Sequence, residues 1–335
     1  MARLRRTSAD ERGWTRRRAG SGWTYLDADG ERLSEDDAQR CRELVIPPAW
    51  TEVWICPHPN GHLQAVGTDD AGRRQYLYHP DWVARRSEEK YERVLRFGGR
   101  LPRLREQVAT DLADADLTEA QACALAVRLL DVGAFRIGND LYASEHGSFG
   151  LTTLERRHVR RHGELLVFDF VGKSGVEHRV EVDDPVAIES LARMRRRRSQ
   201  HDPQLLAYRE GRRWRSLTPE AVNAYVRSSS GVEATAKDFR TWHATVLAAT
   251  ALSDAPDPDA SATRRKRAVA AVMREVAEYL GNTPTLARSA YVDPRVVDAY
   301  DEGRTIRAAV RRRHRDDDAR RRALERATMR LVRGR

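Results

Sequence analysis

The chain has 335 residues, of which 40% are hydrophobic and 33% charged, and its formal net charge is +10. This length suffices for two domains or one large one, and no apolar run approaches the ~20 residues that a membrane span requires. The three cysteines, Cys41, Cys56 and Cys123, form no CxxC pair, so we expect neither a disulfide framework nor a zinc site, and a cytoplasmic location.

The N-terminal part carries mainly strand patterns. Residues 1–20 are charged, with no apolar segment of a secretory signal behind them, and are expected to be disordered. "GWTYLDADGERL" predicts a hairpin with Asp-Gly in its turn, and "VWICPHPNGHLQAVGTD" and "RRQYLYHP" predict further strands. With the helical pattern "DWVARRSEEKYERVLRF", they predict a small β-rich domain over residues 21–97.

A Gly-Gly-Arg-Leu-Pro segment, residues 98–102, predicts a hinge, and a mainly helical domain is expected over 103–310. Thr118 and Gln121 form a capping-box pattern before "EAQACALAVRLLDVG". One hairpin, "ELLVFDFVGKSGVEHRVEV", interrupts the helices and places Lys173 at its tip. The fold class predicted is therefore α+β.

The later helices carry clear start and stop signals. A capping box at Thr235 and Asp238 opens "AKDFRTWHATVLAATAL", and "AVAAVMREVAEYLG" ends at Gly281. Asp293-Pro294 opens another helix, so Tyr291 falls at a forced change of direction. Residues 311–335 are expected to form an arginine-rich helix or tail that adds nonspecific affinity for a polyanion.

The basic excess favours a polyanionic partner, most often nucleic acid. Only four of the sixty basic residues are lysines: Lys90, Lys173, Lys237 and Lys266. Arginine stays protonated, whereas a lysine among cationic neighbours can give up a proton. Each of these lysines is therefore a candidate proton donor, a role that arginine cannot fill.

Two arginines, one lysine and one tyrosine suffice to cleave a phosphodiester without a metal or a cofactor. Tyrosine is a poor nucleophile at neutral pH and needs help. Fixed guanidiniums stabilise the negative charge that develops on the nonbridging oxygens, and a lysine can protonate the departing alkoxide. The chain contains no Walker loop or HExxH helix.

Six motifs carry a resemblance to type IB DNA topoisomerases, of the small bacterial branch related to the poxvirus enzymes. They are spread from about residue 46 to residue 300, in family order: "IPPAW", "RRQYLYH", "FRIGN", "FVGKSG", "KDFRT" and "LGNTPTLARSAY". The resemblance implies that Tyr291 is the nucleophile that forms a 3′-phosphotyrosyl link. It also implies that Arg136 and Arg240 hold the phosphate and that Lys173 is the general acid for the 5′-hydroxyl leaving group.

One position departs from the poxvirus and eukaryotic pattern. Nine residues before the tyrosine those members have a histidine, and this chain has Asn282. An asparagine amide can donate the same hydrogen bond to a nonbridging oxygen, but without positive charge. His243, three residues after Arg240, could compensate or could simply be a packed or solvated histidine.

The resemblance also implies duplex DNA as partner, held by a monomer whose N-terminal domain clamps the opposite face, and a nucleoid-associated location. The family's groove contacts correspond to Gln75, Tyr76 and Tyr78. Glutamine can read adenine edges, but the two tyrosines share one strand face, which could instead be buried. Lys237 could contact the phosphate backbone or pair with Asp238.

Two alternatives stay open. A tyrosine recombinase shares the Arg/Lys/Tyr chemistry but needs an HxxR motif, and "KDFR" lacks that histidine. A noncatalytic basic DNA-binding protein would bind with a steep salt dependence and leave no covalent adduct.

Overall fold

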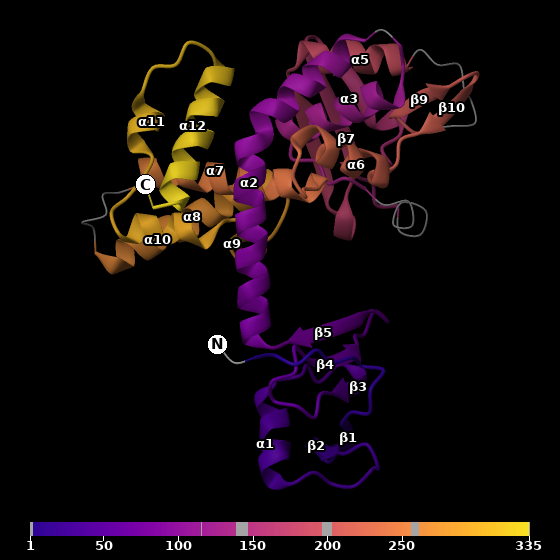
Figure 1. The fold of residues 1–335 in the computed structure, drawn as a ribbon, viewed down its shortest axis with the longest axis vertical. Coiled ribbons are helices and arrows are strands. Elements are labelled where there is room, and N and C mark those ends of the chain that lie inside the picture. Colours follow the sequence, from indigo (N-terminus) through magenta and orange to yellow (C-terminus); the bar gives the residue numbers. More distant parts are fainter. Residues whose placement is uncertain (1–2, 115, 139–146, 196–202, 256–260, 335) are drawn as a thin grey trace. The chain divides into compact units, whose positions relative to one another are not determined.

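The computed structural model describes residues 3–114, 116–138, 147–195, 203–255 and 261–334. The chain divides into two compact units, residues 1–90 and residues 91–335 (Figure 1). The combination of small sheets in the first unit with a mainly helical second unit confirms the predicted α+β class. None of the helices in the described part of the chain is long and apolar enough to cross a membrane.

The first unit consists of two antiparallel sheets and one helix. Its elements are β1 (Thr15–Ala19), β2 (Gly22–Leu26), α1 (Glu35–Glu43), β3 (Thr51–Ile55), β4 (Leu63–Thr68) and β5 (Arg74–Tyr78). The other strands form a sheet in the order β3-β4-β5, as their patterns predict. The predicted hairpin across Asp29-Gly30 is wrong, because β2 pairs with β1 and, among the described residues, only a single bridge, Leu26 to Arg32, spans that turn. Tyr25, Cys41, Ile55 and Ala65 contribute to its small hydrophobic core.

The prediction that residues 1–20 are disordered is wrong for residues 3–20, the part that the structure describes. Arg5 pairs with Gly61, and the Thr7 hydroxyl donates to the Leu63 carbonyl at 3.1 Å. β1 then pairs over its whole length with β2. Arg17 and Arg18 are exposed, whereas the half-buried Arg16 donates to the carbonyls of Ile46 and Trp50, so charge content alone does not indicate disorder here.

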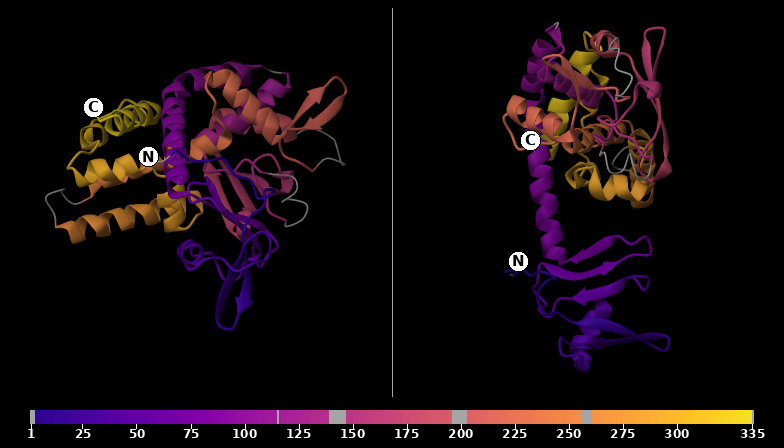
Figure 2. Two further views of the ribbon diagram at one scale, coloured as in Figure 1. Left: turned by 60° about the horizontal axis from the view of Figure 1, so that its bottom comes forward. Right: turned by 90° about the vertical axis from the view of Figure 1, so that its right-hand side faces the viewer.

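The second unit packs helices around a single large core, with a three-stranded antiparallel sheet β6-β7-β8 and a small hairpin β9-β10 (Figure 2). Its strands are β6 (Val159–His162), β7 (Leu165–Val171), β8 (Glu177–Val182), β9 (Ala207–Glu210) and β10 (Arg213–Ser216). Its helices are α2 (Pro80–Ala113, which begins in the first unit), α3 (Glu119–Val132), α5 (Pro185–Arg195), α6 (Pro219–Ser230), α7 (Ala236–Asp254), α8 (Ala262–Leu280), α9 (Pro284–Ala290), α10 (Pro294–Asp301), α11 (Arg307–Arg311) and α12 (Asp317–Val332).

The predicted helix boundaries follow from the caps. Thr118 accepts from the Gln121 amide at the start of α3, and Thr235 and Asp238 form a reciprocal capping box at the start of α7. Gly281 ends α8 with a φ of 59°, a left-handed conformation that favours glycine. Thr283 then caps α9.

The predicted hinge at residues 98–102 is wrong, because α2 continues through this segment as far as Ala113. A Cβ on Gly98 would lie 2.7 Å from the Trp242 ring, so this glycine lets α2 approach α7 closely. Pro102 is tolerated because buried leucines on either side, Leu101 and Leu104, fix the helix to the core. The division between the units falls at residue 90 rather than at residue 97.

The C-terminal segment is helical, as predicted, but it is part of the core rather than a tail. Leu324, Leu331 and Val332 of α12 are buried, and α12 packs beside α7 and α10 (Figure 1). Arg105 of α2 donates to Glu325 of α12 at 2.7 Å and to Asp131 of α3 at 2.8 Å. The helix is therefore fixed by apolar burial and by a buried ionic network.

Candidate active site

Arg136 lies in the segment after α3, and this segment contacts β7 through Phe135 and pairs with the backbone of Leu151. Phe135 is buried and packs edge-on against Phe168 of β7, with ring centroids 5.0 Å apart. The Leu151 amide donates to the Arg136 carbonyl at 2.8 Å. Gly138, with a φ of 103°, completes the turn. The backbone beneath the Arg136 side chain is therefore fixed by packing and pairing.

The half-buried guanidinium of Arg136 contacts neutral groups. It donates to the Asn282 side-chain oxygen at 2.7 Å and to the Gly281 carbonyl at 2.9 Å. Its Nη1 lies 3.2 Å from His178 Nε2. Burial lowers the pKa of Arg136, and the phenol of Tyr291 opposes that shift electrostatically.

Arg240 comes from the first turns of α7 and is only 4% exposed. It donates to the carbonyls of Ala134 and, at 2.7 Å, Leu280, and its Nε has no hydrogen-bond partner among the described residues. Burial and then the charge of Arg136 lower the pKa of Arg240 to about 10. A buried cation beside a second cation is costly unless an anion joins them.

Tyr291 caps the C-terminus of α9, and its ring centroid lies 5.5 Å from Arg240 Cζ. The phenol of Tyr291 opposes the lowering of the Arg240 pKa. Thr245 of α7 donates to the Tyr291 carbonyl at 3.3 Å and accepts from the Asp293 amide at 3.2 Å. The tyrosine backbone is thus fixed to the same helix that carries Arg240.

Asn282 follows the left-handed Gly281 at the end of α8. Because arginine can only donate, the oxygen of the Asn282 amide must face Arg136, which turns the Nδ2 group away. Nδ2 is buried and has no hydrogen-bond partner in the described part of the chain. This nitrogen is therefore a donor that an acceptor oxygen of a ligand can satisfy.

Lys173 stands apart from this cluster. It lies exposed in the short turn Lys173–Gly175 between β7 and β8, where Ser174 has a φ of 66°. Within the described residues it makes no hydrogen bond or ion pair with Arg136, Arg240 or Tyr291. The structure therefore brings Arg136, Arg240, Asn282 and Tyr291 together and leaves the Lys173 ammonium at the hairpin tip.

His178 of β8 is the residue at the site that sequence reasoning did not identify. It contacts Arg136 and stacks on Phe170, with ring centroids 5.3 Å apart. Phe170 and His178 are direct partners in the β7–β8 pairing. The turn sets this register, so the short sequence distance from Lys173 to His178 could have indicated that His178 lies near the site.

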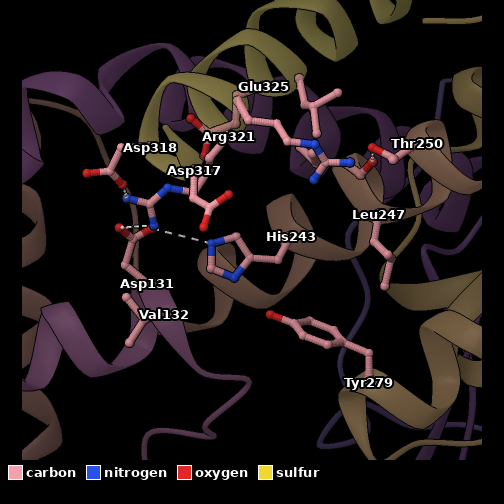
Figure 3. Close-up of a pocket in the computed structure, with 13 residues that line it drawn as sticks. Asp131, Val132, His243, Leu247, Thr250, Tyr279, Asp317, Asp318, Arg321 and Glu325 are labelled. Carbon is pink, nitrogen blue, oxygen red and sulfur yellow. Dashed lines mark hydrogen bonds and ion pairs between the residues drawn. The ribbon is translucent and has the colours of Figure 1, made fainter. Parts of the chain in front are cut away.

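His243 does not compensate for Asn282. It faces Asp131, with its Nε2 3.4 Å from the carboxylate, and lines a cavity of about 510 Å³ between α7 and α12 (Figure 3). Burial alone would raise the pKa of Asp131, but the facing His243 side chain and the charge of Arg105 hold it far below its usual range. His243 thus lies beside the ionic network of Arg105, Asp131 and Glu325.

The predicted DNA-contact residues differ in exposure. Tyr76 and Tyr78 are 51% and 39% exposed and stack with centroids 6.2 Å apart, so their shared strand face is open. Gln75 lies on the other face and donates to Asp69 at 2.8 Å. Lys237 is exposed, and the neighbouring Asp238 pairs with Arg93 at 3.0 Å.

The cluster is suited chemically to a tetrahedral oxyanion. Arg136 and Arg240 supply positive charge, and within the described ranges Arg240 Nε and Asn282 Nδ2 are donors without partners. A phenol stands beside them. A phosphodiester group would satisfy these donors and place its phosphorus atom next to a nucleophile.

Comparisons with known proteins agree with this arrangement. The family description "eukaryotic DNA topoisomerase I, catalytic core" matches residues 80–316, and "bacterial DNA topoisomerase IB, N-terminal domain" matches residues 22–69. The chain is 26% identical over 290 residues to DNA topoisomerase 1B of Acanthamoeba polyphaga mimivirus, covering 85% of this chain and 86% of that protein. DNA topoisomerase 1B of vaccinia virus (strain Copenhagen) is 22% identical over 250 residues, covering 74% of each. The matches span most of the chain and both of its units, and the chain therefore belongs to the type IB DNA topoisomerases.

Proposed function

We propose that this enzyme relaxes supercoiled duplex DNA by cutting one strand, letting the duplex rotate and resealing the strand, without ATP or a metal ion. The observation that carries the proposal is the pair of donors that no described residue satisfies, Arg240 Nε and Asn282 Nδ2, beside two guanidiniums and the Tyr291 phenol. Buried donors without acceptors favour a ligand with several acceptor oxygens, as a phosphodiester has.

In the first step, the Tyr291 phenol loses its proton to solvent, its oxygen bonds to the phosphorus atom, and the bond from phosphorus to the 5′ oxygen of the next nucleotide breaks. A 3′-phosphotyrosyl bond replaces the phosphodiester bond, so one ester is exchanged for another and resealing needs no external energy. The Arg240 guanidinium beside the phenol stabilises the charge that develops on the attacking oxygen. Arg136, Arg240 and Asn282 hold the nonbridging oxygens.

The leaving oxygen needs a proton, which we assign to Lys173. Its ammonium sits on a hairpin whose β8 arm contacts Arg136 through His178. We infer that binding of the duplex moves this exposed turn so that the ammonium reaches the scissile phosphate, because catalytic contacts commonly tighten only in the complex.

The duplex is held by contacts outside the cluster. The exposed Tyr76–Tyr78 face of β5 is available for base or backbone contact, and Gln75 and Lys237 are further candidates. The net charge of +10 supports a sequence-independent affinity for DNA. We infer a monomer that clamps the duplex and resides with the nucleoid.

The test is relaxation of a negatively supercoiled plasmid by the purified chain, with EDTA present and ATP absent. The proposal predicts conversion to relaxed topoisomers, with no joining of two DNA sites. A requirement for ATP or for a divalent ion, or recombinant products, would contradict it.

A further inference from the structure

The imidazole of His178 occupies a gap that two glycines leave open. A Cβ on Gly172 would lie 2.5 Å from His178 Cδ2, and a Cβ on Gly281 would lie 2.4 Å from His178 Cε1. Gly172 precedes Lys173, and Gly281 precedes Asn282. The ring therefore touches both the segment that carries the lysine and the segment that carries the asparagine.

The polar edge of the same ring faces Arg136. Because a guanidinium has no lone pair to accept with, His178 Nε2 must be the acceptor of the 3.2 Å contact with Nη1. The histidine is then neutral, with its proton on Nδ1. Stacking on Phe170 holds the ring plane in place.

The charged groups that face His178 are both cationic. Arg136 comes from the segment after α3 and Arg240 from α7, while β7 and the end of α8 contribute Phe170 and glycine backbone. Burial, then Arg136 and then Arg240 lower the pKa of His178. The surroundings thus favour the neutral form that can accept from Arg136.

We propose that His178 is a positioning residue for the cleavage reaction: its Nε2 orients the Arg136 guanidinium toward the scissile phosphate. The inference rests on the proposed function. Among the described residues the Arg136 guanidinium has three partners, and His178 is the one that contacts Nη1. Without it, the guanidinium keeps its charge but can rotate away from the phosphate.

Two substitutions of His178 distinguish the loss of its hydrogen-bond acceptor from the loss of the volume that its ring fills. His178→Gln keeps an acceptor oxygen at similar reach, and His178→Leu keeps a comparable apolar volume without an acceptor. His162→Leu, at an exposed position of the same sheet, is the matched control. Single-turnover formation of the covalent adduct on a duplex substrate whose cleaved strand cannot religate gives the rate, and thermal unfolding verifies the fold.

We expect His178→Leu to be slower by about 10- to 100-fold, the loss typical of removing a hydrogen bond to a charged group. His178→Gln should stay within about threefold of the unmodified chain, and His162→Leu should be unchanged. Equal rates for His178→Leu and the unmodified chain, or a Gln variant as slow as the Leu variant, would overturn the inference.

A second measurement does not depend on activity. Long-range ¹H–¹⁵N spectra of the full chain, with His178→Gln used for assignment, report the tautomer of each histidine. We expect His178 to carry its proton on Nδ1 and to remain neutral at pH 6.5, whereas a proton on Nε2 would refute the acceptor role. Absence of adduct from the unmodified chain would instead contradict the proposed function and leave the spectra to decide on His178.

Discussion

Arg136 donates to the side-chain oxygen of Asn282 at 2.7 Å, and this contact fixes which end of the amide faces away. The oxygen is taken by the arginine, so the nitrogen is left as a buried donor without a partner among the described residues. An asparagine held in this way can supply the hydrogen bond that a histidine supplies in relatives, provided that Arg136 keeps its place.

Asn282→Asp should slow cleavage strongly, because it replaces the free amide donor with a carboxylate oxygen that repels the phosphate. Loss of one such donor costs about 10²- to 10³-fold in other oxyanion sites. Asn282→His should retain most of the activity. Single-turnover adduct formation measures both variants, and an Asp variant as fast as the unmodified chain would remove Asn282 from the phosphate site.

Lys173→Ala should slow cleavage of ordinary DNA by about 10²- to 10⁴-fold, the range for loss of a general acid. The defect should nearly vanish on a substrate whose leaving oxygen is replaced by sulfur, because a thiolate leaves without a proton. Lys266→Ala, elsewhere on the second unit, is the control. The same defect on both substrates would assign Lys173 a role other than proton donation.

Arg105→Ala should destabilise the fold by about 3–5 kcal/mol, because it leaves the buried carboxylates of Asp131 and Glu325 without their shared partner. Arg103→Ala, exposed on the same helix, should cost less than about 1 kcal/mol. Urea unfolding of both variants measures the difference. Similar free energies of unfolding would show that the ionic network does not fix α12.

Asp131 should also contribute to stability against acid. Its pKa is depressed in the folded chain, so its contribution is present above the unfolded value of ~3.9 and is lost as the pH falls below it. The Asp131→Asn variant should therefore be less stable at pH 7 and should lose less additional stability between pH 5 and pH 3. An unchanged pH dependence of the unfolding free energy would contradict this assignment.

Local signals predicted much of the fold. Capping residues such as Thr118, Thr235 and Asp293 set helix starts, and the alternating patterns set the strands. The failures come from tertiary packing. Gly98 fits against Trp242 instead of breaking α2, and the charged N-terminal residues pair through their backbone. Neither contact is visible in a local window of sequence.

The candidate site was likewise predicted from the sequence only in part. Motif context identified Arg136, Arg240, Asn282 and Tyr291, which the fold brings together. Sequence spacing suggested His243 as a further cation, because it lies one turn from Arg240, but that side chain pairs with Asp131. His178 was missed, because its role depends on a gap between glycines from two distant segments.

The most direct measurement is covalent capture on a duplex whose cleaved strand cannot be resealed, read on a denaturing protein gel and mapped by mass spectrometry. The unmodified chain should form a DNA-linked species with the nucleotide attached at Tyr291, without ATP or metal, and Tyr291→Phe should bind the duplex but form none. A linkage at another residue, or capture that persists in the Phe variant, would contradict the account.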